Sequence, residues 1–181
     1  MQKFGKSQSV LRTEDNRFLT GKGTYIDDST PVGSLFAFFI RSQVAHAEIT
    51  NLDIDDAEKA TGIHAIFTAE DLEKHGVKNN LIGVTVKNRD GSNGASPKRP
   101  LLAKNRVRFV GEPIALVVAD SIQNAKDAAE LVEIDYDDLP VSVELEIGEN
   151  TIHPEAPGNV AFEWNLGNES KTNTAFERAH R

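Results

Sequence analysis

The sequence predicts an α+β domain with a mixed β-sheet and two main helices. Apolar runs typical of strands occur at residues 35–40, 47–54, 63–67, 113–119 and 132–136. Two segments between them, 68–75 and 121–132, have helical periodicity and capping residues. Strands and helices therefore mix along one chain, as they do in α+β domains.

The first two strands have different patterns. Residues 35–40, LFAFFI, are apolar throughout, which predicts a strand buried on both faces. Residues 47–54 alternate apolar and polar side chains, so we expect one buried and one exposed face. A short helix over 55–61 follows, and Gly62 stands where a left-handed residue ends a helix.

The two main helices have recognisable ends. Thr68 and Asp71 form a variant of the capping box, and Gly76 follows the last turn. Asp120 or Ser121 is expected to cap the second helix. Its apolar residues recur on one face at Ile122, Ala125, Ala129 and Val132.

The order of elements also predicts connections. Strand 113–119, helix 121–132 and strand 132–136 follow one another, so we expect a parallel pair joined by a right-handed crossover. Residues 12–28 show neither period and predict an extended arm. Residues 87–100 hold almost no apolar side chain, which predicts a mobile surface loop.

Composition excludes several function classes. The chain of 181 residues has 20 Lys and Arg against 28 Asp and Glu, and its net charge of −8 disfavours nucleic acid as a partner. It contains no cysteine, which excludes disulfides, thiolate nucleophiles and Cys-ligated metals within it. No apolar run is long enough for a membrane span, and no signal peptide is recognisable, so we expect a cytoplasmic protein.

Motifs for catalysis, cofactor binding or metal binding are not recognisable. Gly21-Lys22-Gly23 lacks the spacing of a phosphate-binding loop and predicts a glycine turn. The five histidines include no pair four residues apart, and His64 and His75 are expected to be structural. The acidic run at 135–138 predicts a solvated strand end. We therefore assign no catalytic, cofactor-binding or metal residue.

One interruption stands out within residues 106–119, RVRFVGEPIALVVA. Gly111, Glu112 and Pro113 separate a half-exposed strand at 106–109 from a fully apolar one, which predicts a structural turn. Glu112 could act as a general base, or it could accept hydrogen bonds from turn amides or pair with Arg106 or Arg108. Without a nearby nucleophile or metal motif, the structural role is favoured.

Several stretches together resemble one family. In order and spacing they are similar to the N-terminal part of the molybdenum-binding large subunit of the xanthine dehydrogenase and aldehyde oxidase family, above all to carbon monoxide dehydrogenase large chains. These stretches are RTEDNRFLTGKGTYIDD, FFIRSQVAHAEI, GIHAIFTAEDL, RPLLAKNRVRFVGEPIALVVAD, AAELVEIDYDDLPV and PGNVAFEWNLGN.

The resemblance implies an α/β-hammerhead fold and an oxidoreductase much larger than this chain. Residues 1–33 are then an N-terminal arm and loop, 34–150 the hammerhead domain, and 151–181 an extension leading to a molybdopterin-binding region beyond this chain. Molybdopterin cytosine dinucleotide with molybdenum would be bound there, and 2Fe-2S and FAD on partner iron–sulfur and flavin subunits. This fragment has no counterpart of the family's cofactor loops and catalytic glutamate, and Glu112 does not match that glutamate.

The implied enzyme oxidises an aldehyde, an N-heterocycle or carbon monoxide with oxygen from water, and the fragment itself is expected to be inactive. Two other hypotheses stay open. One is a free-standing binding or subunit-assembly module with the same fold. The other is a carboxylate-dependent hydrolase centred on Glu112 and Asp120.

Overall fold

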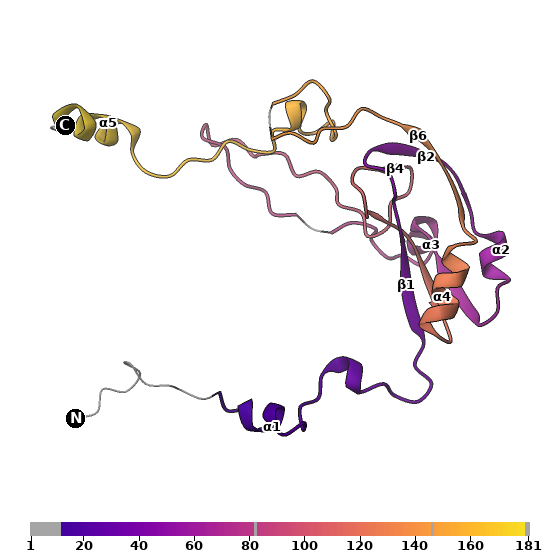
Figure 1. Cartoon of the computed structure of the whole chain (residues 1–181). Helices are drawn as coiled ribbons and strands as arrows, with labels where there is room; N and C mark the ends of the chain where they lie inside the picture. The colour runs from indigo at the N-terminus through magenta and orange to yellow at the C-terminus, as the bar shows by residue number, and fades with distance from the viewer. Residues whose placement is uncertain (1–11, 82, 146, 180–181) are drawn as a thin grey trace, which may run out of the picture. The chain divides into compact units, whose positions relative to one another are not determined.

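The computed structural model describes residues 12–81, 83–145 and 147–179, in two units (Figure 1). The described part of the first unit ends at Ser34 and contains helix α1 (Asp15–Leu19) and a 3-10 turn, η1 (Ile26–Asp28). The rings of Phe18 and Tyr25 stack with centroids 5.7 Å apart. The expected arm therefore contains two short helical turns that its irregular sequence pattern did not indicate.

The second unit, from Leu35 onward, holds two three-stranded sheets. The first sheet has the order β1-β5-β3, made of Phe36–Arg41, Pro113–Ala119 and Ile63–Phe67. The second has the order β4-β2-β6, made of Arg106–Val107, Ala47–Asp53 and Glu133–Asp138. The helices are α2 (Asp55–Glu58), α3 (Ala69–Lys74), α4 (Ile122–Ala129) and α5 (Glu169–Arg178), with a 3-10 turn η2 (Pro157–Asn159). The α+β class is confirmed.

The predicted parallel pair is wrong. β5 and β6 lie in different sheets, and each pairing within the described strands is antiparallel. β6 pairs with β2, placing Tyr136 opposite Ile49. A strand–helix–strand order requires a parallel pair only when both strands share a sheet. The strands expected in one mixed sheet are therefore divided between two antiparallel ones.

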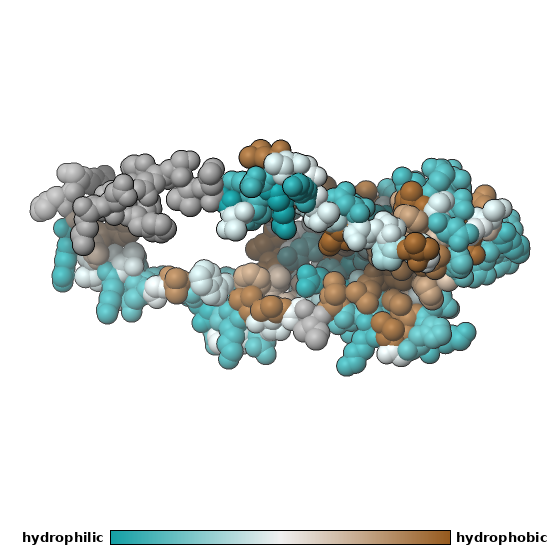
Figure 2. Space-filling model, turned by 90° about the horizontal axis from the view of Figure 1, so that it is seen from below, coloured by the Kyte–Doolittle hydropathy of each residue, from teal (hydrophilic) through white to brown (hydrophobic). Residues whose placement is uncertain are grey.

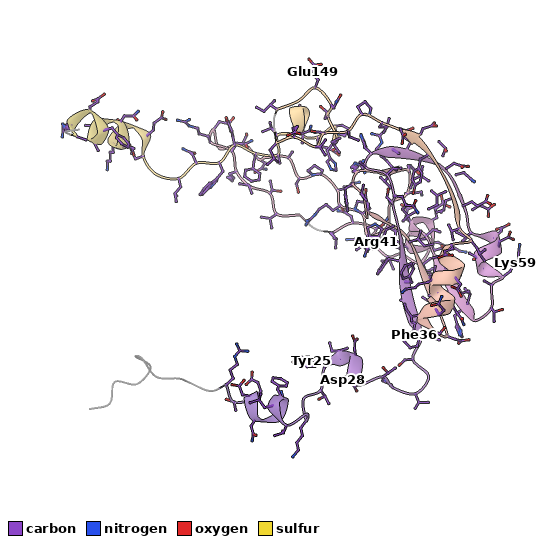
Figure 3. The ribbon with its side chains drawn as sticks, in the orientation of Figure 1. Tyr25, Asp28, Phe36, Arg41, Lys59 and Glu149 are labelled. Atoms are coloured by element: carbon purple, nitrogen blue, oxygen red, sulfur yellow. The ribbon has the colours of Figure 1, made fainter. Side chains whose placement is uncertain are left out.

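The first strand is also placed differently from its prediction. β1 is an edge strand, and Phe36 and Phe39 are 38% and 42% exposed. Phe38 and Ile40 belong to the core beside α4. Figure 3 shows Phe36 and Arg41 at the two ends of this strand. Burial of 35–40 on both faces is thus contradicted within the described residues, whereas β5 is central and mostly buried, as its apolar sequence predicted.

The described residues form two core clusters. Ile114 belongs to one of them, with Ala47, Ala103 and Val107. The other lies between the first sheet and α4. Ala125 and Ala128 of α4 are fully buried against Ala115, Val117 and Ala119 of β5. Small side chains on both elements let the helix approach the sheet closely. Asn124 donates its backbone N–H to Ser121 Oγ at 3.1 Å, so Ser121 is the predicted cap.

Other local predictions have mixed outcomes. Asp135, Asp137 and Asp138 are exposed, which confirms a solvated strand end. The loop at 87–100 has backbone partners that the sequence did not indicate: Ala95 N–H donates to Ala161 O at 2.7 Å, and Arg89 N–H to Glu163 O at 2.9 Å.

Replacing Ile114 by Ala should destabilise the fold. Ile114 is fully buried, so the lost methyl groups and the cavity left behind should lower the free energy of unfolding by about 2–5 kcal/mol in urea denaturation. Ile147→Ala is the matched control, because Ile147 is 82% exposed. Its effect should stay within about 0.5 kcal/mol, and equal losses in the two variants would contradict this core assignment.

Candidate functional site

The structure places the interruption at 111–113 where β1 and β5 begin to diverge. Gly111 has φ +91°, in the region that favours glycine. Pro113 is the first residue of β5 and lies opposite Arg41, next to a register shift in β1. Its carbonyl accepts the N–H of Ala103 at 2.7 Å. A proline at this position costs no ladder bond within the strand interior.

Backbone hydrogen bonds join this turn to the end of β1. Gly111 N–H donates to Ser42 O at 2.8 Å, and Ser42 N–H donates to Glu112 O at 2.9 Å. Arg41 Nη1 donates to Gly111 O at 2.9 Å. The half-exposed strand before the turn is shorter than predicted: β4 ends at Val107, and Phe109 is 55% exposed because the chain already turns there.

Glu112 is 3% exposed, and its Oε2 accepts the backbone N–H of Arg108 at 2.5 Å. Burial raises the pKa of this carboxyl above its ordinary value, against the opposing effect of the Arg108 N–H and charge. Arg106 instead pairs with Glu48. From the sequence, Glu112 is expected to accept hydrogen bonds from turn amides or to pair with Arg106 or Arg108. The structure shows a hydrogen bond from a turn amide. The role of residues 111–113 as a structural turn stays a prediction.

Arg108 and His46 lie near Glu112, and His153 lies near Arg108 and His46. His46 is buried, and its Nδ1 lies 2.7 Å from Pro140 O. Among the described residues, His46 Nε2 and Arg108 Nε are buried without a hydrogen-bond partner. Burial, followed by the charge of Arg108, lowers the pKa of His153. Sequence reasoning missed His46 and His153, since neither lies in a periodic or motif-like segment.

This cluster lacks the partners of a catalytic centre. Arg108 and His46 are a cation and a potential cation beside one buried carboxylate, and the neighbouring Ser42 hydroxyl is already hydrogen-bonded. Ser42 Oγ donates to Val44 O at 2.7 Å, so it is oriented away from a role as nucleophile. Within the described residues, no three His, Asp or Glu side chains gather where they could hold a metal ion.

The hydrolase hypothesis does not survive the placement of its two acids. Glu112 precedes β5 and Asp120 follows it, so a whole strand separates them, on the order of 25 Å at the usual rise per residue. Two carboxylates that share a substrate bond lie much closer, at about 5–10 Å. Asp120 instead lies 2.6 Å from His64 Nε2 in an exposed pair.

A second feature is the apolar groove beside α3. The groove is a hollow of about 390 Å³ between α3, the 101–102 segment and one face of the first sheet. Its lining residues are Phe39, Phe67, Asp71, Leu72, His75, Val77, Leu101, Leu102 and Leu116. Almost all of its lining surface is apolar.

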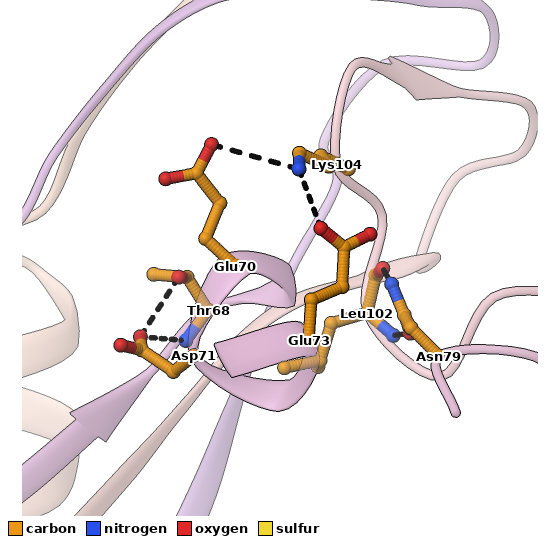
Figure 4. Close-up of polar contacts among 7 residues, drawn as sticks. All are labelled: Thr68, Glu70, Asp71, Glu73, Asn79, Leu102 and Lys104. Carbon is orange, nitrogen blue, oxygen red and sulfur yellow. Dashed lines mark hydrogen bonds and ion pairs between the residues drawn. The ribbon is translucent and has the colours of Figure 1, made fainter. Parts of the chain in front are cut away.

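Hydrogen bonds fix the start of α3 (Figure 4). Asp71 Oδ2 accepts the N–H and the hydroxyl of Thr68, each at 2.8 Å, which confirms the predicted capping box. These bonds lower the pKa of Asp71. His75 lies at the other end of the helix, as predicted.

Contacts from distant residues fix the opposite wall. Asn79 Oδ1 accepts the N–H of Leu101 at 2.9 Å. It also accepts the N–H of Leu102 at 3.0 Å, and Asn79 Nδ2 donates to Leu102 O at 2.8 Å (Figure 4). Lys104 Nζ lies 2.7 Å from Glu73 Oε2. More than twenty residues separate Asn79 from Leu101 in the sequence, so no local pattern could have indicated this contact.

Replacing Glu112 by Gln should change how stability depends on pH. Because its pKa is raised in the folded state, Glu112 contributes stability below its ordinary value of 4.5, and this is lost as the pH rises through the raised pKa. Neutral Gln has no such loss. The free energy of unfolding of E112Q minus that of the native chain should therefore increase from about pH 4 to about pH 7. A difference that stays constant would contradict a raised pKa.

His153 should contribute in the opposite direction. Its pKa is lowered from 6.5, so it contributes stability above this value that is lost as the pH falls through the lowered pKa. His153→Gln should keep its stability better than the native chain on acidification below about pH 6.5, in urea denaturation. The exposed His75→Gln is the control, and the prediction fails if both variants change the profile alike.

Comparisons with known proteins identify the chain's family. Residues 20–140 match the model for "Aldehyde oxidase and xanthine dehydrogenase, a/b hammerhead domain". The chain is 41% identical over 133 residues to the large subunit of nicotine 6-hydroxylase of Paenarthrobacter nicotinovorans, covering 73% of this chain and 15% of that protein. It is 34% identical over 187 residues to the carbon monoxide dehydrogenase large chain of Afipia carboxidovorans, covering 93% and 21%.

A solved structure agrees with these matches. That of the Cu,Mo-CO dehydrogenase in its carbon monoxide reduced state is similar, with a TM-score of 0.69, 32% identity, and coverage of 95% of this chain and 22% of that one. The chain thus spans about a fifth or less of the length of these relatives. None of the helices formed by its described residues is long and apolar enough to cross a membrane.

The family model covers well over half of the chain and includes both sheets, α3 and α4. The chain belongs to the aldehyde oxidase and xanthine dehydrogenase family, and it contains the a/b hammerhead domain of that family.

Proposed function

We propose that this chain is the N-terminal structural region of the large subunit of a molybdenum-dependent oxidoreductase. The family match over residues 20–140 carries the proposal. The names of the relatives support it, because they describe large subunits or large chains of a hydroxylase and of dehydrogenases. The complete enzyme oxidises an aldehyde, an N-heterocycle or carbon monoxide, and takes its oxygen from water.

The chain divides into three parts under this proposal. Residues 1–33 form an arm, 34–150 the hammerhead domain, and 151–181 an extension towards a molybdopterin-binding region. The relatives are several times longer than this chain, which leaves ample length for that region. The hammerhead domain supports the catalytic region by packing against it, because its described surface carries many exposed large apolar side chains.

The described residues do not fit the cofactor themselves. Their His, Asp and Glu side chains do not gather in groups that could hold a metal. The buried carboxylate, Glu112, accepts a backbone N–H in a turn and has no open approach that the structure shows. We propose that molybdenum and molybdopterin cytosine dinucleotide bind in a later part of the large subunit, and we derive no step of the reaction from the residues of this chain.

Partner subunits complete the proposal. We assign a 2Fe-2S cluster and FAD to iron–sulfur and flavin subunits that receive the electrons, in the cytoplasm. One relative is named as subunit gamma of a dehydrogenase complex, which supports an assembly of several chains. Electrons removed from the oxidised substrate need such acceptors, because each oxidation must be balanced by a reduction.

Expression of the complete reading frame with its neighbouring genes tests this proposal. The purified protein should contain molybdenum and should oxidise an aldehyde, an N-heterocycle or carbon monoxide. In water enriched in oxygen-18, the product should carry the heavy isotope, because water supplies the oxygen. The 181-residue chain alone should bind no molybdopterin and show no turnover.

Two outcomes would overturn the proposal. Molybdopterin binding or turnover by the 181-residue chain would place the active site within it. A reading frame that ends at Arg181 would instead favour the free-standing assembly module. Sequencing beyond this codon separates that module from a large subunit before any protein is made.

A further inference from the structure

The apolar groove beside α3 is a preformed hollow on the surface of the second unit. Its volume of about 390 Å³ is within the range of binding pockets. Leu72 lines it from α3, Phe67 and Leu116 from the first sheet, and Leu101 and Leu102 from the opposite segment. A polar group that could orient a small polar ligand is found only at its edge, in Asp71 and His75.

Hydrogen bonds within each wall of this groove hold its backbone in place. The Asn79 side chain makes three hydrogen bonds to the backbone of Leu101 and Leu102. Asp71 is bonded to Thr68 at the start of α3. Both walls are thus fixed by hydrogen bonds that do not depend on an occupant. The segments that line the hollow therefore have defined backbone positions without an occupant.

Apolar side chains continue from the groove onto the surrounding surface. Phe39 and Val77, both in its lining, are 42% and 45% exposed. Apolar patches are also visible among polar residues on the face in Figure 2. A small molecule could fill the hollow but would leave these flanking side chains in water, whereas a polypeptide segment can cover both.

We propose that the apolar groove receives apolar side chains from the later part of the same large-subunit polypeptide. This inference rests on the proposed function. The matched relatives are about five or more times the length of the aligned region, so such a polypeptide exists in each of them. Its chemistry is that of an apolar segment, since the lining offers few polar partners. The groove is therefore an interface within one chain.

Photo-crosslinking in the full-length large subunit tests this interface. Phe39 is replaced by p-benzoyl-phenylalanine, which keeps an aromatic ring at the edge of the groove. Lys59 receives the same residue as the control, because its side chain is 71% exposed just after α2 (Figure 3) and does not line the groove. After irradiation, peptide mass spectrometry should find position 39 joined to residues beyond Arg181 severalfold more often than position 59.

The partner of the crosslink decides between occupants. A mixture of isotope-labelled and unlabelled protein distinguishes a crosslink within one chain from one between two copies. Crosslinks only between copies, or a yield at position 39 no higher than at position 59, would overturn the inference. The molybdenum content of the same preparation is measured separately. Crosslinking within the chain without molybdenum would disprove the proposed function and leave the interface intact.

Discussion

The fold depends on the pairing of β1 with β5 and on its continuation through Ser42 into the turn at Gly111 and Glu112. Ser42 exchanges backbone hydrogen bonds of 2.8 and 2.9 Å with this turn. On one side the turn leads into the central strand of the first sheet, and on the other Ser42 leads through His46 into β2 of the second sheet. The path of the chain between the two sheets is therefore set here, and Glu112 lies buried in this turn with the Arg108 N–H as its partner.

Local features of the fold could be predicted from the sequence because they depend on neighbouring residues. Strand β3 has the predicted bounds, Ser121 caps α4, and Asp71 completes the capping box with Thr68. Each rests on periodicity or on a side chain that reaches only three residues along the chain. Gly111 has a positive φ, which favours glycine, and the proposed role of residues 111–113 as a structural turn rests on the same kind of local signal.

Long-range features could not be predicted, because their determinants lie far apart in sequence. The pairing of β6 with β2 places Tyr136 opposite Ile49, and nothing in either segment specifies the other. His153 lies near both Arg108 and His46, although the three residues come from separate segments. Asn79 binds Leu101 although more than twenty residues separate them in the sequence. Such contacts are tertiary, and the periodicity of a sequence does not predict them. For the same reason, the sequence indicated Glu112 as a candidate residue but not His46 or His153.

The wrong prediction for β1 is informative about the environment of this domain. A continuous apolar run indicates burial on both faces in the native protein, whatever supplies the second face. Within this chain, α4 covers one face, while Phe39 on the other borders the apolar groove and remains partly exposed. If a later part of the large subunit covers the face of β1 that carries Phe39, the apolar sequence of β1 is consistent with its partial exposure in this chain. The apolar run of β1 would then reflect the complete subunit, in which both faces of this strand are covered.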